Sequence, residues 1–588
     1  MNKNKQTLKD TFNEALKHYK EKNFENALYV CNKILSIDTN HFDSILLLSN
    51  IFAVNRDFAK AKEFLYRALE IQPKNLTVIN NLGTTYKELG DFEKSRNYYE
   101  KVLAIDPNHV NAHFNMGILF YKLKDLKKAK EYFQKTTLMQ GNYAFAFFSL
   151  GNVETDLKEY ENAIRSFQKA IEINPKLPGP HNNLGLVFRT LNDFENAISC
   201  YKKVIEIKPN HAGALHNLAQ TYKEMGKFDK AIESHEEAIK HEPNNTSHYY
   251  YLSELKKNIL DSSLKIKINK LLENKKSTRT NHAYGNYILA KYERETKNYE
   301  NEMKYLIKGH KNFFESRKEK FDLGIKYCFD DVLQITEGVN FINSSKTKDY
   351  DIRPIYIIGV PRCGSTLVEK IIASGQDFIP IGEETSVLEN YINAKILEKQ
   401  SLNLGDIDQI REEVLNLYKQ KGLISKKYKN IFTDKSLNNF FYLEFIKEVY
   451  PNAKIINCNR NKISSIMSIF QNNLTELAWT HSLENIFKYF DNYFAIIEAF
   501  NDTHPNLIYD LQFEDLIENP EEESKKLMHF CELPWDKKCL EFYKRKDLIS
   551  KTTSNIQIRR SIYKQKTDKY SPYKKFLDKY GKKYTWYN

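Results

Sequence analysis

The sequence predicts an all-α repeat solenoid followed by an α/β domain with a central parallel sheet. Two observations predict this fold class. Proline recurs on a strict 34-residue period through the first half of the chain, and short β-rich runs separated by helical patterns replace that period in the second half. The chain has 588 residues, which is also too long for one ordinary core. We therefore expect two or more domains.

Each unit of the first half reads as two amphipathic helices, with small residues where the helices touch and proline where the second helix ends. The residues in register are Pro73, Pro107, Pro175, Pro209 and Pro243, and the small residues Ser49, Gly83, Gly117, Gly151, Gly185 and Ala219. This pattern and its period resemble the tetratricopeptide repeat (TPR), with about seven units within residues 1–245. The resemblance implies a superhelix of stacked helix pairs.

The domain boundaries follow from where the period stops. Residues 281–315 read as one more degenerate helix pair after an irregular stretch at 246–280. We expect 246–342 to be a TPR-like helical cap and connector, 343–354 to be a polar linker, and 355–588 to be the α/β domain.

The concave face of such a superhelix usually binds extended peptides or other proteins, so the expected partner of this half is a protein or peptide. Asparagine recurs on the same period at Asn81, Asn115, Asn183 and Asn217. Two interpretations are open. The asparagines form a polar ladder that holds a peptide backbone, or they are common in the repeat and act only locally.

Composition limits the remaining function classes. The seven cysteines are scattered without a C-x-x-C pair, which fits a reducing compartment and predicts no structural zinc. We expect a cytoplasmic protein without a membrane partner, because the start of the chain lacks an apolar signal region and no run approaches the ~18 apolar residues of a membrane span. The net charge of +13 is spread along the chain except for a basic stretch at 559–576. It indicates solvated surface or an anionic ligand, and without a nucleic-acid module we expect no nucleic-acid partner.

Four β-rich runs alternate with helical patterns in the second half and predict a parallel sheet. They are 355–360, 429–434, 453–458 and 506–511. Arg362, Lys435 and Arg460 follow the first three runs directly. Because ligands bind at the carboxyl ends of parallel strands, these three cations are expected to converge on one edge of the sheet.

The stretch "GVPRCGST", 359–366, is nearly a nucleotide-binding P-loop, but Ser365 stands where the lysine should follow the second glycine. A strand, a tight turn and a helix start still direct backbone N–H groups and a helix dipole at one point, which suits an anion. The missing lysine argues against a P-loop kinase. A sulfuryl group carries less charge than a phosphoryl group and needs no metal.

Four motifs within 355–588 together resemble the sulfotransferases that use 3′-phosphoadenosine 5′-phosphosulfate (PAPS), most closely the protein-tyrosine sulfotransferase branch and its TPR-linked bacterial relatives. "GVPRCGSTL" resembles the 5′-phosphosulfate loop, and "GEET", 382–385, the segment that supplies the catalytic base. "TDKS", 433–436, lies where the family has a lysine beside the leaving group, and "YPNAKIINCNRNKISSIMS" resembles the 3′-phosphate motif. The order and spacing of all four agree with the family.

The resemblance implies a P-loop-like sulfotransferase domain that moves a sulfuryl group from PAPS to an acceptor hydroxyl, leaves 3′-phosphoadenosine 5′-phosphate and uses no metal. Glu384 would be the base, with Lys435 and Arg362 stabilising the charge that develops during transfer. The implied cofactor-binding residues are Arg362, Cys363, Gly364, Ser365, Thr366, Arg460 and Ser468. Simpler interpretations remain: Glu384, Lys435 and Arg460 as ordinary surface charges, and Ser365 as a helix cap.

The end of the chain carries further candidates. Phe513 falls where the family has an aromatic that faces the adenine, and a plain core role is an alternative. Ser554, Arg559 and Lys566 lie in a stretch that resembles the closing loop of TPR-linked members, and are candidates for cofactor contacts.

One departure bears on the acceptor. In the tyrosine-specific enzymes an arginine implicated in acidic peptide recognition follows "GEET", whereas here Ser386 follows. The acceptor could therefore be a protein side chain, a glycan or a small molecule. The alternative function is a TPR interaction scaffold whose C-terminal domain binds a nucleotide without turnover.

Overall fold

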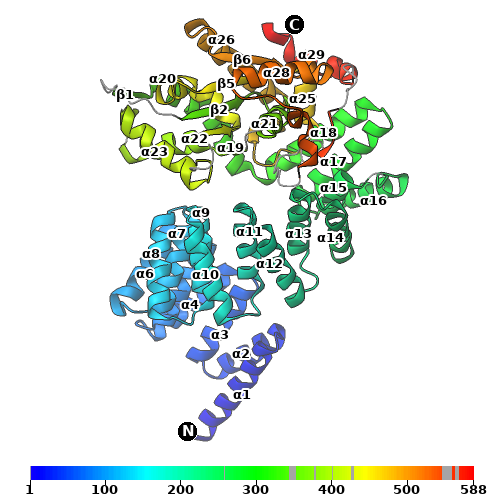
Figure 1. The fold of residues 1–588 in the computed structure, drawn as a ribbon. Helices are drawn as coiled ribbons and strands as arrows, with labels where there is room; N and C mark the ends of the chain where they lie inside the picture. The colour runs from blue at the N-terminus through cyan, green and yellow to red at the C-terminus, as the bar shows by residue number, and fades with distance from the viewer. Residues whose placement is uncertain are drawn as a thin grey trace. The chain divides into compact units, whose positions relative to one another are not determined.

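The computed structural model describes residues 2–256, 258–342, 352–375, 379–399, 401–424, 430–545, 559–562 and 569–587. The chain divides into two compact units, Met1–Leu218 and Ala219–Asn588. Figure 1 labels the helices and strands. Among the described residues, none of the helices combines the length and the apolar character that a membrane crossing requires.

The first part of the chain consists of consecutive helix pairs. They are α1 (Asn2–Lys20), α2 (Phe24–Ile37), α3 (Phe42–Val54), α4 (Phe58–Ile71), α5 (Leu76–Glu88), α6 (Phe92–Ile105), α7 (Val110–Lys122), α8 (Leu126–Met139), α9 (Ala144–Asp156), α10 (Tyr160–Ile173), α11 (Pro178–Thr190), α12 (Phe194–Ile207), α13 (Ala212–Glu224) and α14 (Phe228–His241). The pairs follow the 34-residue period, so the predicted all-α solenoid is confirmed.

A glycine and an aromatic ring hold the two helices of a repeat together. A Cβ on Gly117 would lie 2.6 Å from the Phe133 ring, and a Cβ on Gly83 equally close to Tyr99. These distances are far below ordinary van der Waals contact, so the helices can approach this closely only where no side chain intervenes. The recurring small residue in the sequence is therefore a packing requirement.

The asparagines of the predicted ladder make separate hydrogen bonds between neighbouring repeats. Each of its members donates its side-chain amide to an asparagine of the preceding repeat. The pairs are Asn81 to Asn50 (3.4 Å), Asn115 to Asn80 (3.1 Å), Asn183 to Asn152 (2.7 Å) and Asn217 to Asn182 (3.0 Å). The ladder thus stabilises the stacking of the repeats, and peptide binding by the same residues stays a prediction.

A helical cap follows the repeats. Its elements are α15 (Thr246–Leu255), α16 (Ser262–Glu273), α17 (Arg279–Glu295), α18 (Tyr299–Ser316), α19 (Lys318–Lys326), the π-helix η1 (Tyr327–Asp331) and α20 (Val332–Gly338). The helix pair expected at 281–315 is present as α17 and α18. The stretch 246–280 was expected to be irregular, and this expectation is wrong because Asn245 and Asp261 cap two short helices there with side-chain hydrogen bonds.

The second unit contains the predicted parallel sheet. Its strands are β2 (Arg353–Ile358), β4 (Ile431–Asp434), β5 (Lys454–Asn459) and β6 (Ile508–Gln512), in the order β4-β2-β5-β6. The chain runs from β2 to β4 on one side and then to β5 on the other, so the strand order reverses at the carboxyl end of β2. In open parallel sheets ligands bind at such a switch point.

Further elements complete this unit. A small parallel sheet that the sequence did not predict pairs β1 (Asn340–Ile342) with β3 (Asn403–Asp406). The remaining helices are α21 (Ser365–Ala373), α22 (Val387–Lys399), α23 (Ile407–Gln420), η2 (Leu437–Tyr442), α24 (Leu443–Val449), α25 (Lys462–Phe470), η3 (Ala478–His481), α26 (Leu483–Thr503), α27 (Phe513–Glu518), α28 (Pro520–Phe530), η4 (Lys537–Lys544), η6 (Ser571–Tyr573), α29 (Lys574–Gly581) and η7 (Thr585–Tyr587).

The cap and the sheet domain share one hydrophobic core within the second unit. Two buried histidines lie where they meet. His310 Nε2 donates to the Phe470 carbonyl oxygen at 2.7 Å, and the Nδ1 atoms of His310 and His481 lie 2.9 Å apart. Burial lowers the pKa of His310 to about 4 and that of His481 to about 2. Both rings are therefore neutral at physiological pH.

Candidate active site

The loop between β2 and α21 is built for an anion. Gly364 caps α21 with a left-handed backbone, φ +106°, and Ser365 and Thr366 form the first turn of the helix. At Gly359, φ is +151° and a Cβ would lie 2.6 Å from Cys363 Sγ. The loop therefore needs both glycines, and it leaves the N–H groups and the positive dipole end of α21 at the carboxyl edge of the sheet.

Arg362 holds the centre of this loop in a strained conformation. Its φ of +69° is uncommon for a residue with a side chain, and such strain is concentrated at functional sites. Its Nε donates to Ser468 Oγ on α25 at 3.1 Å, and its carbonyl oxygen accepts from Arg460 Nη1 at 2.9 Å. Three residues predicted to bind the two ends of the cofactor thus meet, from three separate segments of the chain.

The electrostatics of this cluster favour a bound anion. Burial, together with the positive charge of Arg460, lowers the pKa of Arg362. Two guanidinium groups held this close repel each other, and a bound phosphate or sulfate group relieves that repulsion.

Phe513 lies against both the loop and Arg460. The Arg460 guanidinium carbon is 4.8 Å from the centre of the Phe513 ring, and a Cβ on Gly364 would overlap this ring. The ring is buried at the start of α27, directly after β6. These contacts fit the interpretation of Phe513 as a core residue. They also place the ring beside the predicted phosphate site, and contact with an adenine stays a prediction.

The "GEET" segment runs along the end of β4 as an added strand. Thr433 N donates to the Pro380 carbonyl oxygen and Lys435 N to that of Gly382, each at 3.0 Å. A Cβ on Gly382 would overlap the Thr433 carbonyl oxygen, so the close approach needs a glycine there. This pairing places Glu383 opposite Lys435 in an isolated bridge and brings Glu384 next to it.

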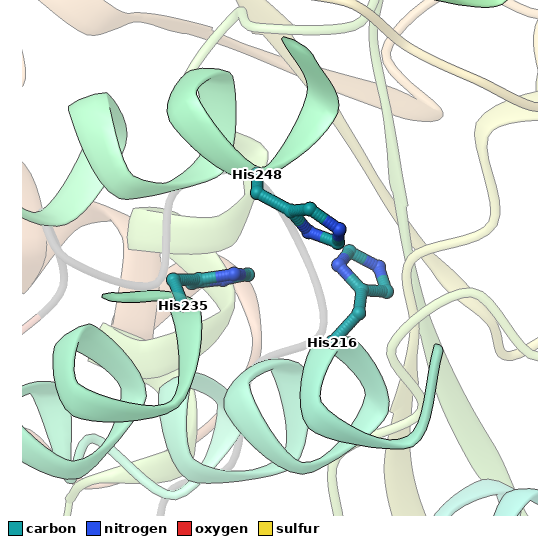
Figure 2. Close-up of side chains that lie close together, drawn as sticks. All are labelled: His216, His235 and His248. Atoms are coloured by element: carbon teal, nitrogen blue, oxygen red, sulfur yellow. The ribbon is translucent and has the colours of Figure 1, made fainter. Parts of the chain in front are cut away.

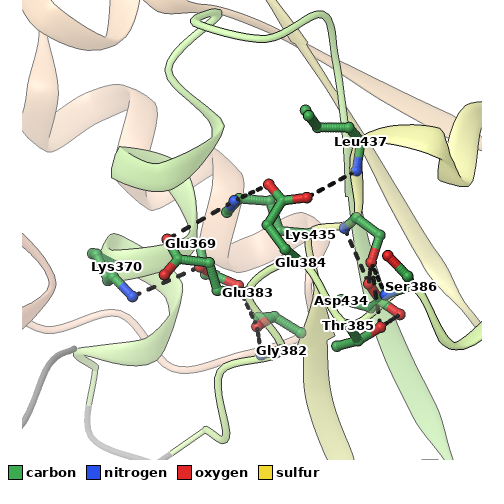
Figure 3. A network of polar contacts seen from close by, with 12 residues as sticks. Glu369, Lys370, Gly382, Glu383, Glu384, Thr385, Ser386, Asp434, Lys435 and Leu437 are labelled. Carbon is green, nitrogen blue, oxygen red and sulfur yellow. Dashed lines mark hydrogen bonds and ion pairs between the residues drawn. The ribbon is translucent and has the colours of Figure 1, made fainter. Parts of the chain in front are cut away.

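Glu384 and Lys435, the predicted base and the predicted cation, form an ion pair (Figure 3). Lys435 Nζ lies 2.9 Å from Glu384 Oε1 and 3.9 Å from Glu383 Oε1. The Lys435 side chain is 2% exposed, whereas that of Glu384 is 39% exposed. Burial opposes the charged form of Lys435, but Glu384, Glu383 and Glu369 outweigh it and raise the pKa of the lysine. Lys435 is therefore a permanent buried cation beside a carboxylate that solvent can reach.

Asp434 fixes the geometry of this pair and was not singled out in the sequence. Its carboxylate accepts from Thr385 Oγ1 at 2.6 Å, from Ser436 Oγ at 2.7 Å and from the Tyr418 hydroxyl at 2.7 Å. Ser436 Oγ in turn accepts from Ser386 N at 2.8 Å (Figure 3). Asp434 thus connects the "GEET" segment with the end of β4, and the only sequence signal for it is its place in "TDKS".

The remaining predicted residues have different surroundings. The Cys363 thiol is buried, and a hydrogen bond with Cys458 lowers its pKa to about 7. Its side chain therefore faces the interior, so a contribution to an anion site would come from its backbone. Arg559 Nη2 donates to the Glu224 carbonyl oxygen at 3.1 Å, at the end of α13. Ser554 and Lys566 lie outside the described residues.

Three further histidines lie on successive helices, His216 on α13, His235 on α14 and His248 on α15 (Figure 2). The boundary between the two units falls inside α13, so His216 belongs to the first unit and the other two to the second. His248 Nε2 lies 3.3 Å from a carboxylate oxygen of Glu242, and burial lowers the pKa of His248. We assign no metal to these histidines.

Two parts of the chain match known protein families. Residues 354–537 match the Sulfotransferase family, and residues 42–108, 75–137, 151–192 and 180–241 match tetratricopeptide repeats. The chain thus carries a sulfotransferase-family domain together with TPR repeats, and the predicted resemblance is confirmed.

Curated relatives are similar to parts of this chain at low sequence identity. An uncharacterized protein of Aquifex aeolicus is 31% identical over 239 residues, which are 38% of this chain and 31% of the relative. Protein-tyrosine sulfotransferase A of Caenorhabditis elegans is 23% identical over 270 residues, 42% of this chain and 67% of the relative. Protein-tyrosine sulfotransferase 1 of Danio rerio is 25% identical over 206 residues, 32% of this chain and 55% of the relative. The chain thus spans about a third of the Aquifex protein and just over half of the Danio enzyme.

Solved structures are also similar to parts of the chain. The crystal structure of MamA is 28% identical, with a TM-score of 0.27, and the match covers 28% of this chain and 97% of that one. The structure of YrrB, described as a TPR protein with an unusual peptide-binding site, is 23% identical, with a TM-score of 0.28, and the match covers 32% of this chain and 96% of that one.

Proposed function

We propose that the α/β domain transfers a sulfuryl group from PAPS to an acceptor hydroxyl, and that the TPR solenoid binds the acceptor or a protein partner. The observation that carries the proposal is the arrangement at the carboxyl edge of the sheet. Arg362 contacts both Ser468 and Arg460 beside the start of α21, and Glu384 and Lys435 form an ion pair at the end of the adjacent strand β4.

The residues present fit the donor. The glycine-bounded loop and the first turn of α21 would hold the 5′-phosphosulfate, with Arg362 beside them. Arg460 and Ser468 would hold the 3′-phosphate, which distinguishes PAPS from ATP. When bound, PAPS supplies an activated sulfuryl group and a phosphate leaving group.

Glu384 is suited to accept the proton of the acceptor hydroxyl. Its side chain is partly exposed, so an acceptor can reach it, and Oε1 lies 2.9 Å from Lys435 Nζ, which fixes its position. The φ of Glu384 is +53°, an uncommon backbone conformation of the kind concentrated at functional sites, and it supports this role.

Lys435 supplies positive charge from a fixed position. The ammonium is buried and held by Glu384 and Glu383, so it needs no rearrangement to face negative charge developing nearby. Preorganised charge of this kind accounts for a large share of enzymatic rate enhancement.

The acceptor class remains a choice among a protein side chain, a glycan and a small hydroxylated molecule. Ser386 stands where an arginine would mark acidic peptide recognition, and its N–H is engaged with Ser436. This residue therefore supports no preference for acidic tyrosine peptides.

Donor turnover by matched variants tests the proposal. The full chain is incubated with PAPS and, in turn, a tyrosine peptide, an oligosaccharide and a phenol, and release of 3′-phosphoadenosine 5′-phosphate and the acceptor mass are followed. We expect Glu384→Gln to lower turnover by about 10²- to 10⁴-fold, because a positioned base contributes that much. Binding of the product nucleotide should be retained.

Glu398→Gln, at an exposed position of α22, is the control and should turn over PAPS like the wild type. Tight binding of the nucleotide without turnover by the wild type on any acceptor would favour the alternative, a TPR scaffold with a non-catalytic nucleotide-binding domain.

A further inference from the structure

Glu369 is a buried carboxylate that the roles above leave unused. It lies on α21, the helix that begins at the phosphate loop, and both Glu369 and Lys370 are fully buried. Lys370 Nζ lies 3.7 Å from Glu369 Oε2. Burying a charged pair carries a large desolvation cost, so its presence beside the site calls for an explanation.

Thr433 connects Glu369 to the catalytic pair. The Thr433 hydroxyl donates to Glu369 Oε1 at 2.9 Å and accepts from Gly382 N at 3.1 Å. Gly382 begins the "GEET" segment, and its carbonyl oxygen accepts from Lys435 N at 3.0 Å. A continuous chain of hydrogen bonds therefore runs from the phosphate-loop helix through β4 to the segment that carries Glu384 (Figure 3).

The charges around Glu369 belong to the same cluster. Lys370 lies next to it on α21, Lys435 faces it from the end of β4, and Glu383 faces it from the "GEET" segment. Burial raises the pKa of Glu369 to about 7, against the opposing effects of the two lysines. Glu369 also contributes to keeping Lys435 protonated.

We propose that Glu369 is a positioning residue for the sulfuryl-transfer site, which through Thr433 holds Glu384 and Lys435 in register with the phosphate loop. The inference rests on the proposed function, because it assigns Glu369 to the geometry of that reaction. Glu369 does not touch the reacting atoms. Its loss acts on the turnover step, while the nucleotide, held by Arg362, Arg460 and Ser468, still binds.

Two substitutions separate geometry from charge. Glu369→Ala removes the closer acceptor of the Thr433 hydroxyl and leaves the Pro380 carbonyl oxygen at 3.4 Å. We expect this to loosen the "GEET" segment and turnover of PAPS to fall about 100-fold, since a displacement of about 1 Å costs that much. Glu369→Gln keeps an acceptor oxygen but not the charge, and should recover most of the activity lost in the alanine variant. The affinity for 3′-phosphoadenosine 5′-phosphate should be unchanged in both.

The pH profile supplies a readout that a purely structural role would not change. Ionised Glu369 is the stronger acceptor for Thr433 and favours protonated Lys435. Wild-type turnover should therefore rise as the pH increases through about 7, the pKa of Glu369. Glu369→Gln should lack this rise.

A measurement independent of activity keeps the two proposals distinguishable. Hydrogen exchange of the peptide covering 379–388 should become faster in Glu369→Ala, because Gly382 N then loses its fixed acceptor. The control is Glu293→Ala, which removes another buried carboxylate, paired with Lys265 at 2.8 Å in the cap. It should leave the exchange of this peptide unchanged.

Nucleotide binding by the wild type tests the proposed function, and the Glu369→Ala variant tests the positioning role. A wild type that binds no 3′-phosphoadenosine 5′-phosphate contradicts the proposed function, whatever Glu369 does. Unchanged exchange and unchanged turnover in Glu369→Ala, in a wild type that does turn over PAPS, overturn the positioning role alone. An equal loss of turnover in Glu293→Ala would show general destabilisation and would also overturn it.

Discussion

The repeats and the sulfotransferase domain use glycine in two different ways. In the repeats, Gly117 meets the ring of Phe133, and the same contact returns 34 residues earlier between Gly83 and Tyr99. In the second unit, Gly382 meets the backbone oxygen of Thr433 within a single site. The comparison teaches that each glycine contact in the repeats has equivalent contacts in neighbouring repeats, whereas the proposed site depends on a contact that occurs once among the described residues.

The largest expected effect comes from adding one methyl group at each glycine. Gly382→Ala forces a Cβ onto the Thr433 carbonyl oxygen, which cannot move without shifting Lys435, so we expect turnover of PAPS to fall by about 100-fold or more. Gly117→Ala meets the end of a side chain, which can shift at a cost of about 1–3 kcal/mol. It should leave turnover unchanged.

Steady-state kinetics and thermal unfolding of both variants measure this contrast. If Gly117→Ala abolished turnover while the fold was retained, the two halves would be coupled more closely than the comparison allows. If Gly382→Ala turned over PAPS normally, the close pairing of "GEET" with β4 would not matter for the reaction.

Acid should weaken the second unit through its buried histidines. The pKa of folded His310, about 4, lies below the ordinary value of about 6.5, so the unfolded chain binds more protons below pH 6.5. The stabilisation is complete above pH 6.5 and is lost as the pH falls toward 4. Between pH 6.5 and 5 the loss is about 2 kcal/mol for His310, and His481 acts in the same direction.

Calorimetric unfolding between pH 7 and 5 checks this dependence. His310→Gln should reduce it, and His529→Gln, at an exposed position of α28, should leave it as in the wild type. An unchanged slope in His310→Gln would show that the histidine contact between the cap and the sheet domain does not control acid stability.

The smallest effect is expected in the ladder of the first unit. Asn115→Ala removes the side-chain hydrogen bond to Asn80, which is 3.1 Å long, and should lower the free energy of unfolding by about 0.5–1.5 kcal/mol. Nucleotide binding should not change. Chemical denaturation measures the free energy of unfolding. A loss of several kcal/mol would mean that Asn115 stabilises the stacking of the repeats through more than this one hydrogen bond.

The sequence predicted regular features better than exceptions. A period of 34 residues and four apolar runs were enough for the helix pairs and the central sheet, because burial imposes those patterns directly. The two short strands β1 and β3 escaped prediction because three or four residues show no clear periodicity. Helix α16 escaped because it follows no repeat, and α15 escaped because it ends after ten residues, although it begins 34 residues after α13.

Within the site, the motifs led to Arg362, Glu384, Lys435 and Arg460, but not to the residues that hold them. Glu369 was not singled out by any motif, although it is buried on the helix that follows the phosphate loop. Long-range hydrogen bonds such as those that tie α21 to β4 leave no local signal in a sequence. The cofactor roles of Phe513 and Arg559 stay predictions, because the contacts of both residues are with other parts of the protein.

Binding calorimetry with 3′-phosphoadenosine 5′-phosphate, without added metal, tests whether the carboxyl edge of the sheet is a site for a 3′-phosphorylated nucleotide. ATP and AMP serve as competing ligands. The control for Arg460→Ala is Arg353→Ala, because Arg353 lies at the start of β2 and pairs with Glu532. We predict tight binding of the 3′-phosphorylated nucleotide alone, weakened by Arg460→Ala and unaffected by Arg353→Ala. Equal or tighter binding of ATP, or no effect of Arg460→Ala, would contradict the sulfotransferase assignment of this site.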